Sequence, residues 1–196
     1  MSRHRALAAI EEQHRSIGAV IHGLQFLTAD AVARGTAPDL VLLRAMLSYI
    51  HEYPDRLHHP AEDRTLFARL RQRTREADDL VAELEAEHAQ SERRLEALAG
   101  ALRRVEEGER DGAAQLASLV REYADFHWEH MRKEEERVFP IAARTLVDED
   151  WTAIEEAFGS HRDPRFGADD VADGFRKLFS RIVALAPPPI GVGPER

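Results

Sequence analysis

The chain has 196 residues, of which 43% are hydrophobic and 32% charged, enough for one domain with a well-formed core. Its net charge of −9 argues against a nucleic-acid-binding protein, which needs a basic face. The sequence contains no cysteine, which excludes disulfides, thiolate nucleophiles, iron–sulfur clusters and cysteine-rich zinc sites.

The N-terminal stretch does not have the pattern of a secretory signal, because Glu11 and Glu12 interrupt it before an apolar core could form. No stretch approaches the ~18 apolar residues of a membrane span. We therefore expect a cytoplasmic protein that binds neither membrane nor nucleic acid.

The first predicted helix covers residues 2–34 and stops at Gly35, and the third covers residues 77–107 and stops at Gly108. In both helices apolar residues recur every three or four positions, which is typical of a core-facing stripe. A histidine takes one of the core positions in each stripe. These histidines are His14 and His88.

The second predicted helix opens with Pro38 in its first turn, and the fourth opens near Gly112. Proline lacks a backbone donor, so we expect Pro54 and Pro60 to kink or interrupt the second helix. Pro140 is expected to bend the fourth helix near its end.

The second and fourth helices each contain His-x-x-x-Glu, then three further residues, and then an aliphatic residue and Phe. Residues four apart lie on the same helix face, so each pair can direct a nitrogen and an oxygen at one metal ion. The pairs are His58 with Glu62 and His130 with Glu134. One such pair is a weak signal, but two with the same downstream sequence, each preceded by a lone core histidine, form an internal repeat.

The four histidines lie at similar distances along the chain from the helix ends, so at ~1.5 Å rise per residue they reach one level of the bundle. We predict an all-α, up-down-up-down four-helix bundle over residues 1–146 with a metal site in its middle. The alternative without a metal is a network of His–Glu hydrogen bonds in the same section of the core. It is disfavoured because buried polar groups without partners cost ~1–3 kcal/mol each.

Other polar residues near the motifs are weaker candidates. His127 lies one turn before the histidine of the second pair and is the candidate for an additional ligand. His51 and Glu135 could also complete the site. His59 and Asp63 lie further round the helix and are interpreted as surface or supporting residues.

After the bundle the pattern changes. We expect residues 147–185 to form a helical extension packed on the bundle, with a short helix from Asp150 to about Phe158 and a second one from about Asp169. Residues 186–196, which are rich in proline, are expected to be a disordered tail.

The motifs resemble the hemerythrin family, specifically the bacterial hemerythrin-like HHE cation-binding domains, over about residues 5 to 146. The residues that carry the resemblance are His14, His58, Glu62, His88, His130 and Glu134. The resemblance implies two iron ions with an oxo or hydroxo bridge, held by the histidines and bridged by the glutamates. It also implies a small ligand such as dioxygen, peroxide or nitric oxide.

The chain departs from the oxygen-carrying members of that family. It has no second histidine one turn from His88, and its last carboxylate is a glutamate four residues after its histidine. The resemblance therefore favours a protein that reacts with an oxidant over a reversible oxygen carrier.

Three alternatives remain open from the sequence. A ferritin-like centre would use Glu11-x-x-His14 and Glu85-x-x-His88 as its ligand pairs. The same ligands would also suit a non-catalytic iron buffer, or an iron donor for the repair of iron centres. A helical interaction module without metal is the third.

Overall fold

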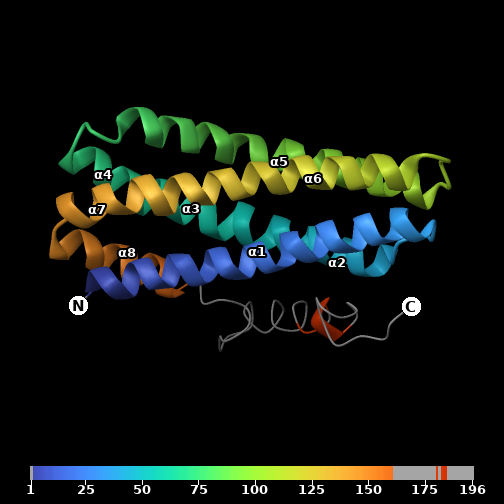
Figure 1. Cartoon of the computed structure of the whole chain (residues 1–196). Coiled ribbons are helices and arrows are strands. Elements are labelled where there is room, and N and C mark those ends of the chain that lie inside the picture. Colours follow the sequence, from blue (N-terminus) through green and yellow to red (C-terminus); the bar gives the residue numbers. More distant parts are fainter. Residues whose placement is uncertain (1, 161–179, 181, 185–196) are drawn as a thin grey trace.

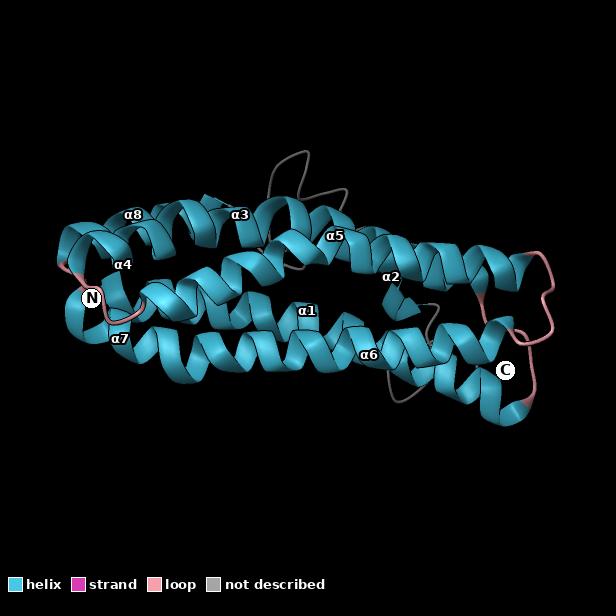
Figure 2. Ribbon diagram, turned by 90° about the horizontal axis from the view of Figure 1, so that it is seen from above, coloured by secondary structure: helices cyan, strands magenta, loops and turns pink. Residues whose placement is uncertain are grey.

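The computed structural model describes residues 2–160, 180 and 182–184, and these form an all-α bundle of four long rods and one short helix. In Figure 1 consecutive rods run in opposite directions, and Figure 2 shows the same rods from above with the loops at their two ends. The rods are α1 (Ser2–Arg34), residues 40–73, α5 (Asp78–Glu106) and residues 112–145. The short helix is α8 (Asp148–Ser160).

The second and fourth rods are each built from several helical segments. The second contains α2 (Leu40–Ile50), η1 (His51–His58), α3 (His59–Ala61), η2 (Glu62–Phe67) and α4 (Ala68–Arg73). The fourth contains α6 (Gly112–Lys133), η3 (Glu134–Val138) and α7 (Phe139–Thr145). The segments η1, η2 and η3 are π-helical, so their turns take up one more residue than an α-helix does.

The helix ends follow local chain chemistry. Gly35 and Gly108 have φ angles of 63° and 76°, the left-handed conformation that glycine adopts without strain, and each follows the end of a long helix as predicted. The predicted start of the second helix was wrong by two residues. Pro38 precedes it, because Asp39 acts as the N-cap and accepts hydrogen bonds from the backbone amides of Val41 and Leu42.

The rods continue through the prolines, and the α-helical pattern of the second rod is interrupted by π turns at Pro54, in keeping with the predicted kink or interruption. Pro54 lies inside η1, where the amide of His59 donates to the Pro54 carbonyl five residues earlier. Pro60 and Pro140 lie in the first turns of α3 and α7. The missing proline donors are therefore accommodated by a wider helical turn, which changes the direction of the side chains that follow.

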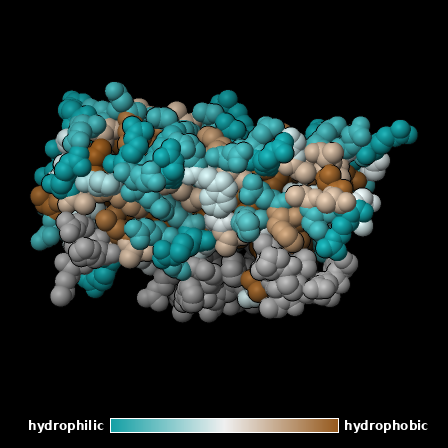
Figure 3. All heavy atoms as spheres, viewed as in Figure 1, coloured by the Kyte–Doolittle hydropathy of each residue, from teal (hydrophilic) through white to brown (hydrophobic). Residues whose placement is uncertain are grey.

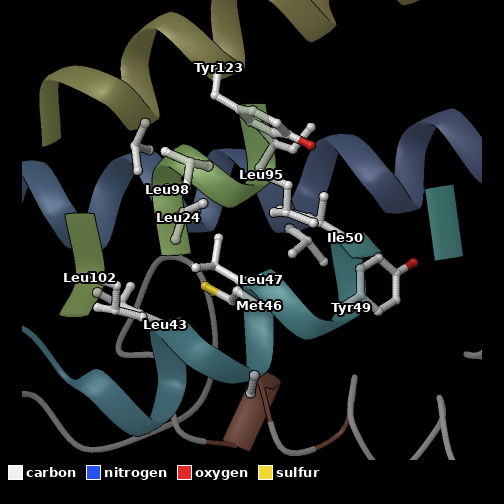
Figure 4. Close-up of a cluster of buried hydrophobic side chains, with 14 of the residues drawn as sticks. Leu24, Leu43, Met46, Leu47, Tyr49, Ile50, Leu95, Leu98, Leu102 and Tyr123 are labelled. Atoms are coloured by element: carbon white, nitrogen blue, oxygen red, sulfur yellow. The ribbon is translucent and has the colours of Figure 1, made fainter. Parts of the chain in front are cut away.

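Two apolar clusters fill the bundle. The first contains Leu24 of α1, Met46 and Leu47 of α2, Leu98 of α5 and Tyr123 of α6, which point toward one another in Figure 4. The second lies toward the other end of the rods. It includes Ile10, Phe67, Leu84, Val138 and Ala142, together with Trp151, Ile154 and Phe158 of α8.

Helix α8 packs against α1 and completes the second cluster. It is longer than the predicted short helix and is fixed by Asp150, whose carboxylate is buried and accepts hydrogen bonds from Arg69 and Arg73 of the second rod. Of the second helix predicted in the extension, the structure describes positions 180 and 182–184, which are helical, and Ile182 is buried in the first cluster. The predicted tail lies outside the described residues.

The face of the molecule in Figure 3 is largely hydrophilic, with scattered apolar side chains. Within the described residues one helix, Arg5–Arg34, is long and apolar enough to cross a membrane by length and composition. The expectation that no stretch approaches this length was therefore wrong. Half of its most apolar window is buried inside the bundle, as in the core helix of a bundle.

Candidate metal centre

The six predicted ligands meet in the section of the bundle between the two apolar clusters. Each rod contributes to this section at the point where its buried residues change from one cluster to the other. All six side chains are nearly or fully buried, and both glutamates have no exposed surface. They are His14 of α1, His58 of η1, Glu62 of η2, His88 of α5, His130 of α6 and Glu134 of η3.

The six residues form two groups whose ligand atoms are close enough to surround one ion each. The first group is His14, His58 and Glu62, and the second is Glu62, His88, His130 and Glu134. Glu62 belongs to both. Its Oε1 lies 3.3 Å from His58 Nε2, and its Oε2 lies 3.5 Å from His88 Nε2.

Glu134 divides its oxygens between the groups in the same way. Its Oε2 lies 3.4 Å from His14 Nε2, whereas its Oε1 lies 3.5 Å from His130 Nε2. The Nε2 atoms of His88 and His130 are 3.0 Å apart. Both carboxylates therefore present one oxygen to each group of histidines, an arrangement that suits two neighbouring metal ions sharing two carboxylates.

In all four histidines, Nδ1 is the ring nitrogen that faces away from the two groups. It has an oxygen acceptor in each case. At 2.8 Å in each case, the Nδ1–H of His14 donates to Glu135, that of His58 to Gln13, that of His88 to Asp63 and that of His130 to Glu87. An acceptor at Nδ1 keeps the proton there and leaves the Nε2 lone pair free for a metal. These contacts favour a proton on Nδ1 in all four imidazoles, so that Nε2, which is directed inward, can bind a metal.

These hydrogen bonds follow the internal repeat. In each half the residue before the lone histidine accepts from the other histidine of that half, as Gln13 does from His58 and Glu87 from His130. The residue after the glutamate of each His-x-x-x-Glu pair reaches the lone histidine of the other half. Those contacts join Asp63 to His88 and Glu135 to His14.

Two phenylalanines of the repeat also cross between the halves. Phe67 stacks on the ring of His88 with centroids 5.8 Å apart, and Phe139 stacks on that of His14 at 6.1 Å. These are the phenylalanines that follow the two His-x-x-x-Glu motifs in the sequence. Their position explains the shared downstream pattern, because each covers a ligand of the opposite half.

Helix α8 supports His58 of the first group through Phe158. The Gln13 side-chain amide donates to the carbonyl of Phe158 at 3.2 Å, which turns the Gln13 oxygen toward His58. The Phe158 ring packs edge-on against the His58 ring, with centroids 5.9 Å apart. One residue of α8 therefore orients a ligand both directly and through Gln13.

The charges of the site are strongly coupled. Burial alone would lower the pKa of His14, but its hydrogen bond to Glu135 and the nearby carboxylates of Glu62 and Glu134 raise it to about 10. The pKa of His88 is raised as well, since its hydrogen bond to Asp63 and the two glutamates outweigh its burial. Burial and the charge of Glu62 raise the pKa of Glu134 to about 7.

The polar atoms of the site fit a metal. Within the described residues, both oxygens of Glu62, both oxygens of Glu134 and His14 Nε2 are buried without a hydrogen-bond partner. Buried polar groups are normally hydrogen-bonded, and orphaned carboxylate oxygens are especially costly. Metal coordination would satisfy these atoms together, because carboxylate oxygens and imidazole nitrogens are ligands for borderline divalent ions.

The weaker candidates take other places. His127 is buried beside Tyr123, with ring centroids 4.3 Å apart, and belongs to neither group. Its pKa is lowered to about 3 by burial and by the neighbouring histidines. His51 is half-buried and pairs with Glu52. Glu135 supports His14 without being in either group.

The ferritin-like arrangement does not form in the structure. Glu85 pairs with Arg71 at the surface, and neither Glu11 nor Glu85 belongs to a metal-binding group of the described residues. His58 and His130, which that arrangement would leave unused, lie inside the groups instead.

Sequence analysis missed the role of several residues. His59 is buried in the site, 5% exposed, and lies in the short α3 segment between the π-helical segments η1 and η2. Gln13 and Glu87 support ligands on another helix. The sequence did hold one signal for this role: each of the two residues comes immediately before the lone histidine of its half.

A surface pocket of about 540 Å³ adjoins the first group, between α1 and α6. His14, Glu135, Met131 and Trp128 are in its lining. A β-carbon at Gly18 would lie 3.0 Å from the Trp128 ring, so glycine there lets the indole lie against α1. The pocket brings solvent to the outer edge of His14, which itself is only 3% exposed.

Four helical rods that enclose inward-facing imidazoles and shared carboxylates define a metal-binding four-helix bundle. A family model described as the hemerythrin HHE cation binding domain matches residues 5–142. The chain therefore belongs to the hemerythrin HHE cation-binding family, and the resemblance seen in the sequence is confirmed. Neither the curated proteins nor the solved structures gave a match.

Proposed function

We propose that the protein is a non-haem di-iron protein that binds or reduces a small oxidant, namely dioxygen, peroxide or nitric oxide. The observation that carries the proposal is the pair of buried glutamates, Glu62 and Glu134, which each present one oxygen to each histidine group. A single ion would leave part of this symmetric arrangement unused. Two ions would use all six ligands.

The donor set supports iron. It consists of imidazole nitrogens and carboxylate oxygens, a combination that suits iron and other borderline ions better than soft thiophilic metals. The family description gives a cation-binding domain, which agrees with this chemistry without choosing the element. We propose an oxo or hydroxo bridge between the two ions, which the resemblance to the family implies.

The chain's own residues prepare the site in three ways. His14, His58, His88 and His130 would hold the ions through Nε2, while the acceptors at Nδ1 keep each ring in place. Glu62 and Glu134, which have no exposed surface themselves, supply carboxylate oxygens to the site. Bound iron would supply the electrons and Lewis acidity for reduction of the oxidant.

The surroundings favour a small and weakly polar ligand. Apolar clusters close the section on both sides, so a ligand must fit between packed side chains. Leu84, Phe67 and Phe139 lie next to the ligands and offer no hydrogen-bond donor that would hold a charged adduct. This supports reaction with an oxidant rather than its reversible storage.

An iron buffer, or an iron donor for the repair of iron centres, is the second candidate. It is favoured by the outer partners of the lone histidines, since Asp63 is 35% exposed and Glu135 is 44% exposed. Solvent-facing carboxylates one residue from the ligands would give an ion a stepwise route in and out. This candidate needs the same two-ion site but no turnover.

We also propose a cytoplasmic location. The support is that the apolar residues of α1 pack in the bundle core and that this helix carries the ligand His14. No partner protein is proposed.

Metal analysis of anaerobically reconstituted protein, with an optical spectrum before and after exposure to air, tests the proposal. We expect two iron ions per chain and an oxo-bridge absorption band that develops in air and does not reverse under vacuum. Consumption of added peroxide would favour turnover over buffering. Close to one iron per chain would overturn the di-iron proposal, and a gas adduct that dissociates under vacuum would restore the oxygen-carrier interpretation.

A further inference from the structure

His59 lies beside the second histidine group although it is outside both His-x-x-x-Glu pairs. Its ring is parallel to that of His88, with centroids 4.3 Å apart and an angle of 14°, and its centroid lies 5.6 Å from that of His130. A ligand nitrogen of His59 lies within 4.8 Å of those of His88 and His130. The three histidines therefore form a possible ligand set of their own.

The Nδ1 atom of His59 faces a carboxylate, as the Nδ1 atoms of His88 and His130 do. Its Nδ1 faces Asp55 Oδ1 at 3.5 Å, a longer version of the imidazole–carboxylate contact found at His88 and His130. Asp55 is itself fixed, because Ser91 Oγ donates to Asp55 Oδ1 at 2.6 Å. A carboxylate behind a histidine sets its orientation and raises its basicity as a ligand.

The two halves of the bundle differ at this position. In the first half His59 follows the motif histidine His58, whereas in the second half Met131 follows His130. Met131 is 8% exposed and lines the pocket beside His14. A thioether is a soft ligand with little preference for iron, so the second half offers no equivalent nitrogen.

We propose that His59 is a further metal ligand, which adds a third nitrogen to the ion held by His88 and His130. The ion held by His14 and His58 then has two nitrogens, because Met131 takes the place of His59 in the sequence of the second half. The two metal positions are chemically unequal, and the position with fewer protein ligands is the one beside the pocket between α1 and α6. The inference rests on the proposed two-ion site but not on the oxidant.

The test compares His59→Phe with Met131→Leu by anaerobic titration of the metal-free protein with Co²⁺, whose visible absorption reports its ligands. Phenylalanine keeps a ring that can stack on His88 and removes only the nitrogen donor. We expect Met131→Leu to bind two ions with the wild-type spectrum. His59→Phe should bind one of its two ions roughly tenfold or more weakly, with a changed absorption for that ion.

A second variant guards against misfolding of the first. In His59→Ala the removed ring leaves a space that free imidazole can fill, and added imidazole should restore the wild-type Co²⁺ absorption. Weaker binding with an unaltered spectrum would show that His59 only orients His88, and would overturn the proposal. So would variants that match the wild type in both affinity and spectrum.

The proposed function can fail separately from this inference. Wild-type protein that takes up a single Co²⁺ would contradict the two-ion site. The spectra of His59→Phe and Met131→Leu would still decide whether His59 is a ligand of the ion that remains.

Discussion

Gln13 and His58 are joined across two helices by one hydrogen bond of 2.8 Å, from His58 Nδ1 to the Gln13 side-chain oxygen. The orientation of Gln13 is set in turn by α8, whose Phe158 carbonyl accepts from the Gln13 amide nitrogen. Helix α8 lies beyond residues 5–142, to which the family description applies. A segment outside the family's core thus takes part in positioning a ligand.

Replacing Gln13 by Ala should weaken metal binding by the first group. Loss of an outer partner of a metal-bound histidine typically reduces affinity about 10–100-fold, and His58 would lose the Gln13 oxygen that accepts from its Nδ1. Competitive titration with a metal-binding dye would measure the change. Gln90→Ala is the matched control, because Gln90 is exposed and its side chain donates to the Ala86 carbonyl on its own helix. Equal affinities for the two variants would contradict the role of Gln13.

Replacing Glu62 or Glu134 by Ala should remove at least one ion per chain. Each glutamate faces both histidine groups, so either substitution takes one oxygen from both metal positions. Metal content after full reconstitution and desalting gives the answer. Glu136→Ala, at an exposed residue paired with Arg132, should retain both ions. Retention of two ions by both bridging-site variants would show that the carboxylates are not shared.

His127→Leu should keep both ions and leave the metal-free protein equally or more stable. His127 Nε2 is buried without a partner among the described residues, and replacing such a group by an apolar one of similar size is often neutral or stabilising. His130→Leu should instead lose metal. Thermal melts of the chelated proteins, combined with metal analysis, separate these outcomes. Loss of an ion in His127→Leu would make His127 a ligand after all.

The metal-free protein should become less stable as pH rises from about 7 to about 10. The folded-state pKa of His14 is raised from 6.5 to about 10, and that of His88 is raised too, so the folded protein holds protons that the unfolded chain has lost. Stability falls with pH wherever the folded state binds more protons. Melting temperatures with chelator across this range measure the effect, and His14→Gln should flatten it.

The metal-loaded protein should show the opposite dependence. Ions and protons compete for His14, His88 and Glu134, so metal binding strengthens as these groups lose their protons. The stabilisation by metal should therefore grow between about pH 6 and about pH 9. A metal-induced shift of the melting temperature that does not vary with pH would contradict ligation by these residues.

Asp150→Ala should destabilise the protein by about 1–3 kcal/mol, a typical cost for lost charge-assisted hydrogen bonds. The buried Asp150 carboxylate accepts from Arg69, Arg73 and the amide of Val147, and so ties α8 to the second rod. Denaturant unfolding would measure the change. Glu156→Ala on the exposed face of α8 should change stability by much less. If Asp150→Ala also lowers metal affinity, the connection through Phe158 is the expected cause.

Much of the architecture was predictable because repeated local patterns govern it. The apolar stripes and the glycines at positions 35 and 108 predicted the long helices, and the His-x-x-x-Glu spacing identified the residues that meet in the middle. The position of His59 was not predictable. It lies between the π-helical segments η1 and η2, and a hydrophobic period of 3.6 residues carries no information about such turns.

The supporting residues were hidden for a different reason. Gln13, Glu87 and Glu135 act across the bundle, so their role depends on which helices are neighbours. The N-cap at Asp39 was a local signal that competed with Pro38, and the capping carboxylate determined the helix start. The contact between Gln13 and α8 depends on packing of a segment that carries no recognisable motif.

The crossed contacts between the halves have a consequence for the order in which the protein assembles. Glu62 belongs to the first helical hairpin and Glu134 to the second, and each faces histidines of both. A hairpin on its own has half of the ligands and lacks the partner that orients its lone histidine, so it cannot form either metal position. Docking of the hairpins and completion of the site are therefore one event. Ions bound there would connect chain segments far apart in sequence, and would offset part of the entropy of closing the long loop between them.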